Sequence, residues 1–82
     1  MDKTYNGWKN RQTWNVALWI GNEEPLYRAA VEFAGRCKAR AKYRLFIESM
    51  GLEGTRTPDG IAWDGSKLDY RALNEFMSEL TE

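Results

Sequence analysis

The sequence predicts a mainly α fold, a compact bundle of about four short helices over residues 10–20, 25–36, 38–50 and 69–80, with a turn-rich loop or minimal β-turn pair at 51–66. Two observations predict it. Apolar residues recur at steps of three and four in most of these segments, which is the spacing of one helix face. Gly, Pro, Asn and Asp-Gly signals separate the segments. With 82 residues, the chain is expected to form one small domain over 1–82.

The first helix is expected to centre on Thr13–Ile20, where six of eight residues are apolar and point all round the helix. Such a helix belongs in the interior of a fold, so Trp14→Ala is predicted to cost about 3–5 kcal/mol. Asn10 is the expected N-cap, with Thr13 as a competitor. We expect the helix to end at Gly21-Asn22 in a left-handed residue.

Asn15 lies among these apolar residues, and a buried amide left unpaired costs about 1–3 kcal/mol. One interpretation is that Asn15 is presented to a ligand. The other, which we favour, is that it ties this helix to a neighbouring loop.

The second helix opens at Glu23-Glu24-Pro25, with carboxylates at the positive end of the helix dipole and Pro where no N–H is needed. Its apolar stripe is Leu26, Ala30, Phe33 and Cys37. A second stripe lies well over 120° away around a continuous helix and consists of Ala39, Tyr43, Phe46 and Met50. We therefore expect a break or kink between Gly35 and Lys38, and a third helix that Gly51 ends.

Across this junction every second residue is basic: Arg36, Lys38, Arg40, Lys42 and Arg44. On a helix, Arg36, Arg40 and Arg44 would form one drifting row and Lys38 and Lys42 another. One interpretation is phosphate binding. The other, which we favour, is a solvated face of a half-buried helix whose cationic side chains lay their stems on apolar surface. These five residues are the candidate partner-binding residues.

The last third of the chain begins with turns. Asp59-Gly60 and Asp64-Gly65 bracket Ile61–Trp63, and we expect Ile61 and Trp63 to pack onto the helices. A capping box from Ser66 to Asp69, or Asp69 alone, is expected to start the final helix. Its expected buried stripe is Leu73, Phe76, Met77 and Leu80, and its acidic ridge is Glu75, Glu79 and Glu82.

The residues needed for most catalytic chemistry are missing. The chain has no His, which removes Ser-His and Cys-His nucleophiles, and no phosphate-binding glycine loop. The single Cys37 excludes an internal disulfide and is expected to be a buried apolar filler. Asp59, Asp64 and Asp69 lack the spacing of a calcium loop. We expect no enzyme, cofactor or metal.

The N-terminus lacks an apolar signal segment, and the run Val16–Ile20 is too short to span a bilayer. The expected location is the cytoplasm of a bacterial host, without membrane contact. Charge is uneven: residues 1–50 hold nine Lys/Arg and five Asp/Glu, a net +4, while residues 51–82 hold three and seven, a net −4. The halves either attract each other, which we favour, or face different partners.

Two stretches resemble a group of small proteins of bacteriophages, prophages and plasmids. The first is Tyr5-Asn6-Gly7-Trp8-Lys9-Asn10 followed by Thr13–Ile20. The second is Thr57-Pro58-Asp59-Gly60-Ile61 with Trp63, then Leu68-Asp69-Tyr70. The resemblance implies no catalytic or binding residues. Physically, we expect the motifs to build a core from Trp8, Trp14, Leu18, Trp19, Phe33, Phe46, Trp63 and Phe76.

The resemblance implies a setting in which small proteins without enzymatic machinery bind host proteins. Our first hypothesis is an accessory protein that blocks a host protein or ribonucleoprotein complex, as in counter-defence by a CRISPR inhibitor. The alternative is nucleic-acid binding by segment 36–44, which a pI of about 6.3 weakens. A third possibility is a dimerising module, so the expected state is a monomer or small homo-oligomer.

Overall fold

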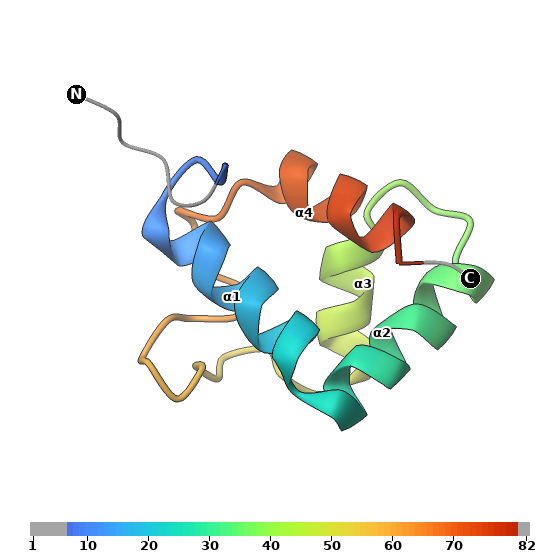
Figure 1. The fold of residues 1–82 in the computed structure, drawn as a ribbon, viewed down its shortest axis with the longest axis horizontal. Coiled ribbons are helices and arrows are strands. Elements are labelled where there is room, and N and C mark those ends of the chain that lie inside the picture. The colour runs from blue at the N-terminus through green and yellow to red at the C-terminus, as the bar shows by residue number, and fades with distance from the viewer. Residues whose placement is uncertain (1–6, 81–82) are drawn as a thin grey trace.

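The computed structural model describes residues 7–80, and most of this part of the chain is helical. The four helices are α1 (Arg11–Asn22), α2 (Glu24–Arg36), α3 (Lys42–Ser49) and α4 (Tyr70–Ser78). Both α2 and α4 contact each of the other helices, whereas α1 and α3 do not contact each other in this part of the chain; Figure 1 shows the arrangement. The predicted mainly α bundle is confirmed.

Helix α1 begins as predicted but ends differently. The Asn10 side chain accepts a hydrogen bond from the Thr13 backbone N–H at 2.9 Å, which confirms Asn10 as the N-cap. The expected left-handed stop at Gly21-Asn22 is wrong, because the helix runs through both residues. Glu23, in an extended conformation, caps the end of α1 and the start of α2. One residue therefore turns the chain between two helices.

The break after Gly35 is confirmed, since α2 ends at Arg36 and α3 begins only at Lys42. The predicted start at residue 38 is wrong. Helix α3 has no side-chain cap from its own sequence; Asn74 of α4 instead accepts a hydrogen bond from the Tyr43 N–H at 3.0 Å. The start of α3 is thus set by a helix 31 residues further along the chain.

The buried core comes from all four helices and the loop before α4. Its apolar members are Val16, Ala17, Ile20, Ala30, Ala34, Tyr43, Phe46, Ile47, Trp63, Leu68, Leu73 and Met77. Of the expected core residues, Phe46 and Trp63 belong to it, and the partly buried ones that pack against it are Trp8, Trp19, Phe33 and Phe76.

Two expected core residues, Trp14 and Leu18, are only half-buried and are not part of this cluster. The prediction that Trp14 and Leu18 belong to the core is therefore wrong, although α1 carries the most buried residues of the four described helices. The reason is that the polar residues Thr13 and Asn15 take buried positions on α1, together with Val16, Ala17 and Ile20. Trp14 and Leu18 are left on the outer side.

Three further residues depart from the expected stripes. Met50 is 41% exposed, and Ala39 lies before α3 and is exposed, because the helix is shorter than predicted. Cys37 follows α2, and it is half-buried where a buried filler was expected.

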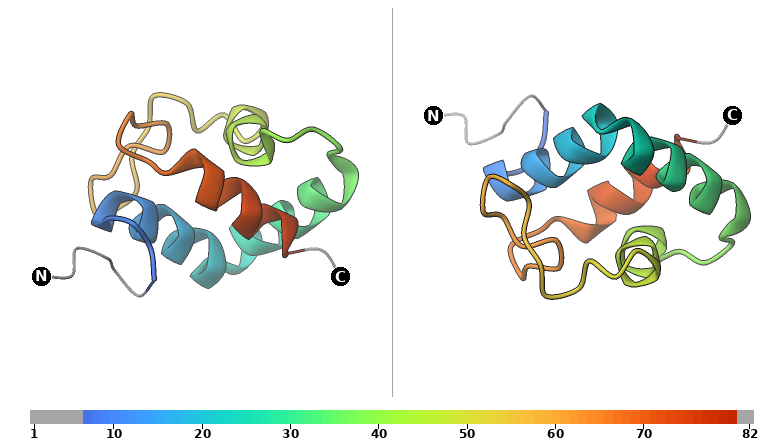
Figure 2. Two further views of the ribbon diagram at one scale, coloured as in Figure 1. Left: turned by 90° about the horizontal axis from the view of Figure 1, so that it is seen from above. Right: turned by 90° about the horizontal axis from the view of Figure 1, so that it is seen from below.

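Residues 50–69 form a compact loop that packs beside α1 (Figure 2). Gly51, with φ 71°, ends α3 in the left-handed conformation that favours glycine. The backbone folds back on itself through Thr57 N–H to Ile61 O at 2.8 Å and Trp63 N–H to Thr55 O at 3.0 Å, with one isolated bridge. This confirms the minimal β-turn arrangement with Trp63 packed on the helices.

Helices α1 and α4 run in the same general direction and are joined where they begin (Figures 1 and 2). The Thr13 hydroxyl donates to Asn10 Oδ1 at 2.7 Å and accepts from the Asp69 N–H at 2.9 Å. Asn10 Nδ2 donates to Lys67 O at 2.8 Å. Asp69 caps α4 through its own side chain, so the alternative with Asp69 alone is correct.

Candidate functional site

The basic segment does not form one helical face. Arg36 ends α2 and pairs with Glu32 at 3.1 Å, while Lys38 and Arg40 lie exposed in the linker. Lys42 donates to Cys37 O, and the Arg44 guanidinium lies 5.5 Å from the centre of the Tyr70 ring. The drifting helical row of Arg36, Arg40 and Arg44 is wrong, because residues 37–41 are not helical.

Asn15 is 1% exposed and makes the loop connection favoured in the sequence analysis. Its Nδ2 donates to Asp59 Oδ2 at 2.8 Å, and its Oδ1 accepts from the Thr57 hydroxyl at 2.7 Å. Trp19 Nε1 donates to the same Asp59 oxygen at 3.0 Å. The two motif stretches therefore bind each other, and their polar residues hold the loop onto α1.

These hydrogen bonds, first from Asn15 and then from Trp19, lower the pKa of Asp59 below its usual 3.8. A group whose pKa is lower in the folded state adds stability at pH values above its unfolded pKa, and this stability is lost as the pH falls through the folded pKa.

We predict that the free energy of unfolding of the wild-type protein decreases as the pH is lowered below about 4. Asp59→Asn should be less stable at neutral pH with a shallower acid loss, measured by urea denaturation from pH 2 to 7. Parallel pH curves for both proteins would contradict this.

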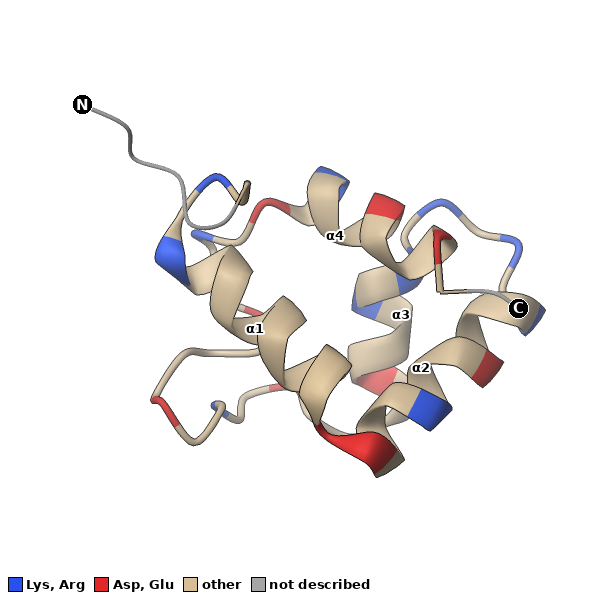
Figure 3. Cartoon of the chain, viewed as in Figure 1, with Lys and Arg blue, Asp and Glu red and all other residues tan. Residues whose placement is uncertain are grey.

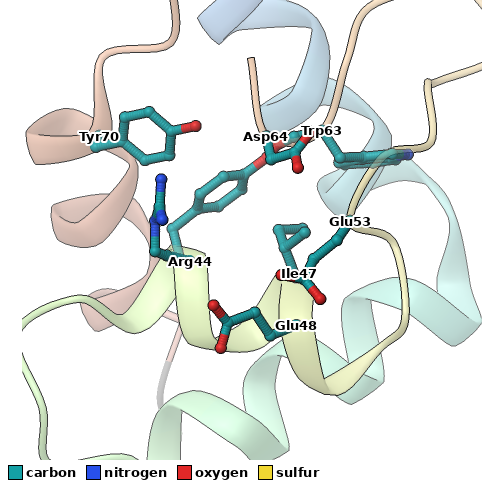
Figure 4. A pocket seen from close by; sticks show the side chains of 8 residues that line it. Arg44, Ile47, Glu48, Glu53, Trp63, Asp64 and Tyr70 are labelled. Carbon is teal, nitrogen blue, oxygen red and sulfur yellow. The ribbon is translucent and has the colours of Figure 1, made fainter. Parts of the chain in front are cut away.

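A small cleft, which no sequence pattern indicated, lies between α3, α4 and the loop (Figure 4). Tyr43, fully buried, donates through its hydroxyl to Trp63 O at 2.6 Å, and burial raises its pKa above the usual 10. Arg44 extends toward the Tyr70 ring, and the carboxylates of Glu48, Glu53 and Asp64 surround the opening. Its volume is about 40 Å³, far below the roughly 300–1,000 Å³ of ligand pockets.

A larger apolar feature lies between α1 and α4, and we call it the aromatic groove. Its walls are Trp8, Trp14, Ala17, Leu18, Gly21, Asn22 and Phe76. The Trp8 and Phe76 rings meet edge to face, with centroids 5.6 Å apart at 75°. A second hollow on the other side of this pair adds Gly7, Ala72, Glu75 and Glu79.

The groove places four large apolar side chains, all half-buried, on one surface: Trp8, Trp14, Leu18 and Phe76. Contiguous exposed apolar patches are uncommon on monomeric domains unless they bind something. Trp14 and Leu18 were expected in the core. The four-residue step between them indicates that they share one helix face. Their apolar character alone does not indicate whether another part of the protein packs on that face.

Charge around the groove is separated along its length. Where α1 and α4 begin lie the exposed cations Lys9, Arg11 and Arg71, together with the half-buried Asp69 that caps α4. Toward the other ends of these helices lie the exposed carboxylates Glu23, Glu75 and Glu79, and Figure 3 shows the acidic and basic segments. The expected acidic ridge is thus present in Glu75 and Glu79, while Glu82 lies outside the described residues.

Within residues 7–80, no group of three or more His, Cys, Asp or Glu side chains could hold a metal ion. Asp59, Asp64 and Asp69 instead bind backbone or side-chain donors: Asp64 accepts from the Gly54 N–H at 3.2 Å. None of the described helices is long and apolar enough to cross a membrane.

The fold and the groove define a small helical domain with a polar motif network on one side of α1 and an apolar groove on another. The chain belongs to a family of unknown function, DUF7249, whose model matches residues 1–82. No curated protein and no solved structure matches it.

Proposed function

We propose that this protein binds a host protein, alone or in a ribonucleoprotein complex, through the aromatic groove and blocks it. The observation that carries the proposal is the gathering of Trp8, Trp14, Leu18 and Phe76 on one surface. Trp is among the residues that contribute most to binding energy in protein interfaces, where it fills desolvated pockets. The resemblance to proteins of phages and plasmids supports a role in a bacterial host, such as counter-defence.

The arrangement of the basic residues favours this proposal over nucleic-acid binding. Arg36, Lys42 and Arg44 have partners within the protein, whereas the exposed Lys38 and Arg40 have none among residues 7–80. Two cations release few counterions, whereas sequence-independent binding to nucleic acid usually needs many phosphate contacts.

The proposal is tested by tagged co-purification from a bacterial lysate, with and without nuclease treatment. We expect a stoichiometric host protein that survives the nuclease. Capture that disappears with the nuclease would contradict the proposal and favour the nucleic-acid alternative.

A matched pair of variants locates the contact surface. Leu18→Lys places a charge inside the groove, and Leu45→Lys places the same charge at an α3 leucine that is 36% exposed and lies outside it. We expect Leu18→Lys to lose the captured protein and Leu45→Lys to keep it. Both should unfold within about 1 kcal/mol of wild type, because a lysine stem can lie on apolar surface with its ammonium in water. If the two variants captured the host protein equally well, the groove would not be the contact surface.

A further inference from the structure

The charges beside the aromatic groove are arranged against the dipoles of the helices that carry them. Carboxylates are favourable near a helix N-terminus and cations near its C-terminus, by about 0.3–1 kcal/mol each. Helix α2 follows this rule, with Glu24 in its first turn and Arg36 in its last. Neither α1 nor α4 has an acidic residue in its first turn or a basic residue in its last.

Helix α4 has the reverse arrangement, with Arg71 in its first turn and Glu75 in its last, followed by Glu79 at its C-cap. None of these three residues forms an ion pair within the described part of the chain. Helix α3 also begins with cations, but Lys42 and Arg44 are engaged by Cys37 O and the Tyr70 ring. On α4, Glu75 and Glu79 line the second hollow, which shares Trp8 and Phe76 with the aromatic groove.

Because α1 and α4 run in the same direction, both begin at one end of the groove and both end at the other. The first end is net positive, because the cations Lys9, Arg11 and Arg71 outnumber the Asp69 carboxylate that caps α4. The other end is net negative, with the carboxylates Glu23, Glu75 and Glu79, and the C-terminus of α1 meets the N-terminus of α2 there. A ligand that matches this surface must be apolar along its middle and oppositely charged at its two ends.

We infer that the aromatic groove receives one amphipathic helix of the partner protein, whose cationic end pairs with Glu75 and Glu79 and whose acidic end faces Lys9 and Arg71. The groove follows α1 from Trp14 to Asn22, with Phe76 of α4 on its other wall, and a helix can pack its side-chain ridges against such a helix face. Helix α1 has 12 residues, about 18 Å, so the occupant spans about three turns. This inference deepens the proposed function and rests on the same groove.

The test uses two synthetic 15-residue peptides, acetylated and amidated so that their ends carry no charge. Both have leucines at helical spacing of three and four, are held helical by a staple on the opposite face, and contain equal numbers of Lys and Glu. One peptide has all its Lys in one half and all its Glu in the other. In the second, Lys and Glu alternate. Affinity for the full-length protein is measured by fluorescence anisotropy of labelled peptide.

We expect the charge-separated peptide to bind about tenfold more tightly than the alternating one, since each exposed ion pair contributes a factor of about two to five. Glu75→Lys/Glu79→Lys should abolish that preference, and 0.5 M salt should reduce it. Leu18→Lys should lose both peptides, whereas Leu45→Lys should keep both. Equal affinity for the two peptides, no binding of either, or a preference that survives the double charge reversal would overturn the inference.

The two failures are distinguishable. If host-protein capture depends on Leu18 but the peptides bind equally, the proposed function stands and the charge-separated helix is wrong. If the peptide preference holds but no host protein is captured, the groove selects such a helix and the proposed blocking of a host complex is wrong.

Discussion

Phe46→Ala is expected to lower the free energy of unfolding by about 3–5 kcal/mol, the usual loss for a buried phenylalanine. Phe46 is 0% exposed and packs against Phe33, with ring centroids 5.7 Å apart. A domain of this size has a total stability of about 4–12 kcal/mol, so the variant should be partly unfolded near 37 °C. Urea denaturation followed by tryptophan fluorescence measures the loss.

The control for this prediction is Leu45→Ala on the same helix, since Leu45 is 36% exposed. We expect it to unfold within about 1 kcal/mol of wild type. Equal losses of stability in the two variants would contradict the placement of Phe46 in the buried core and of Leu45 at the surface.

Asn15→Ala is expected to lower the free energy of unfolding by about 1–3 kcal/mol, because it removes the acceptor of the buried Thr57 hydroxyl and one donor to Asp59. Asn22→Ala, at the exposed end of α1, is the matched control and should change little. The same urea denaturation measures both variants.

Coupling between the two motif stretches can be measured directly for this pair. Thr57→Val removes the hydroxyl that donates to Asn15, so the double variant Asn15→Ala/Thr57→Val should lose less stability than the two single variants added together. Strict additivity would mean that the hydrogen bond does not join the stretches energetically.

Much of the helical architecture could be predicted from local signals. The side chains of Asn10 and Asp69 each cap the helix that follows them. Gly51 adopts the left-handed conformation at the end of α3, and Pro25 lies in the first turn of α2. Each of these acts within a few residues of itself. For the same reason the break after Gly35 could be inferred from the change of apolar face.

The start of α3 could not be predicted, because its cap is Asn74 on another helix. The outer position of Trp14 and Leu18 was missed for a related reason. Thr13 and Asn15 are polar, yet they are buried because Asn10, Asp69, Thr57 and Asp59 pair with them. Hydrophobic pattern alone assigns such positions to the surface and their apolar neighbours to the core.

The aromatic groove could not be predicted for the same reason, since Trp14 and Leu18 in its wall were assigned to the core. The alternating cations of segment 36–44 suggested the partner contacts, but the fold places them on two helices and the linker between them. Chain order does not show that Trp8 and Phe76, 68 positions apart, meet at one groove. Only the tertiary contact between the start of α1 and α4 brings them together.

The most direct measurement is site-specific photo-crosslinking in a bacterial lysate. The photoreactive residue p-benzoylphenylalanine replaces Leu18 in one protein and Leu45 in another, and covalent products are resolved by mass. We expect one dominant host-protein adduct from position 18 and none from position 45. No adduct from either position, or the same adducts from both, would contradict the claim that the aromatic groove is the binding surface.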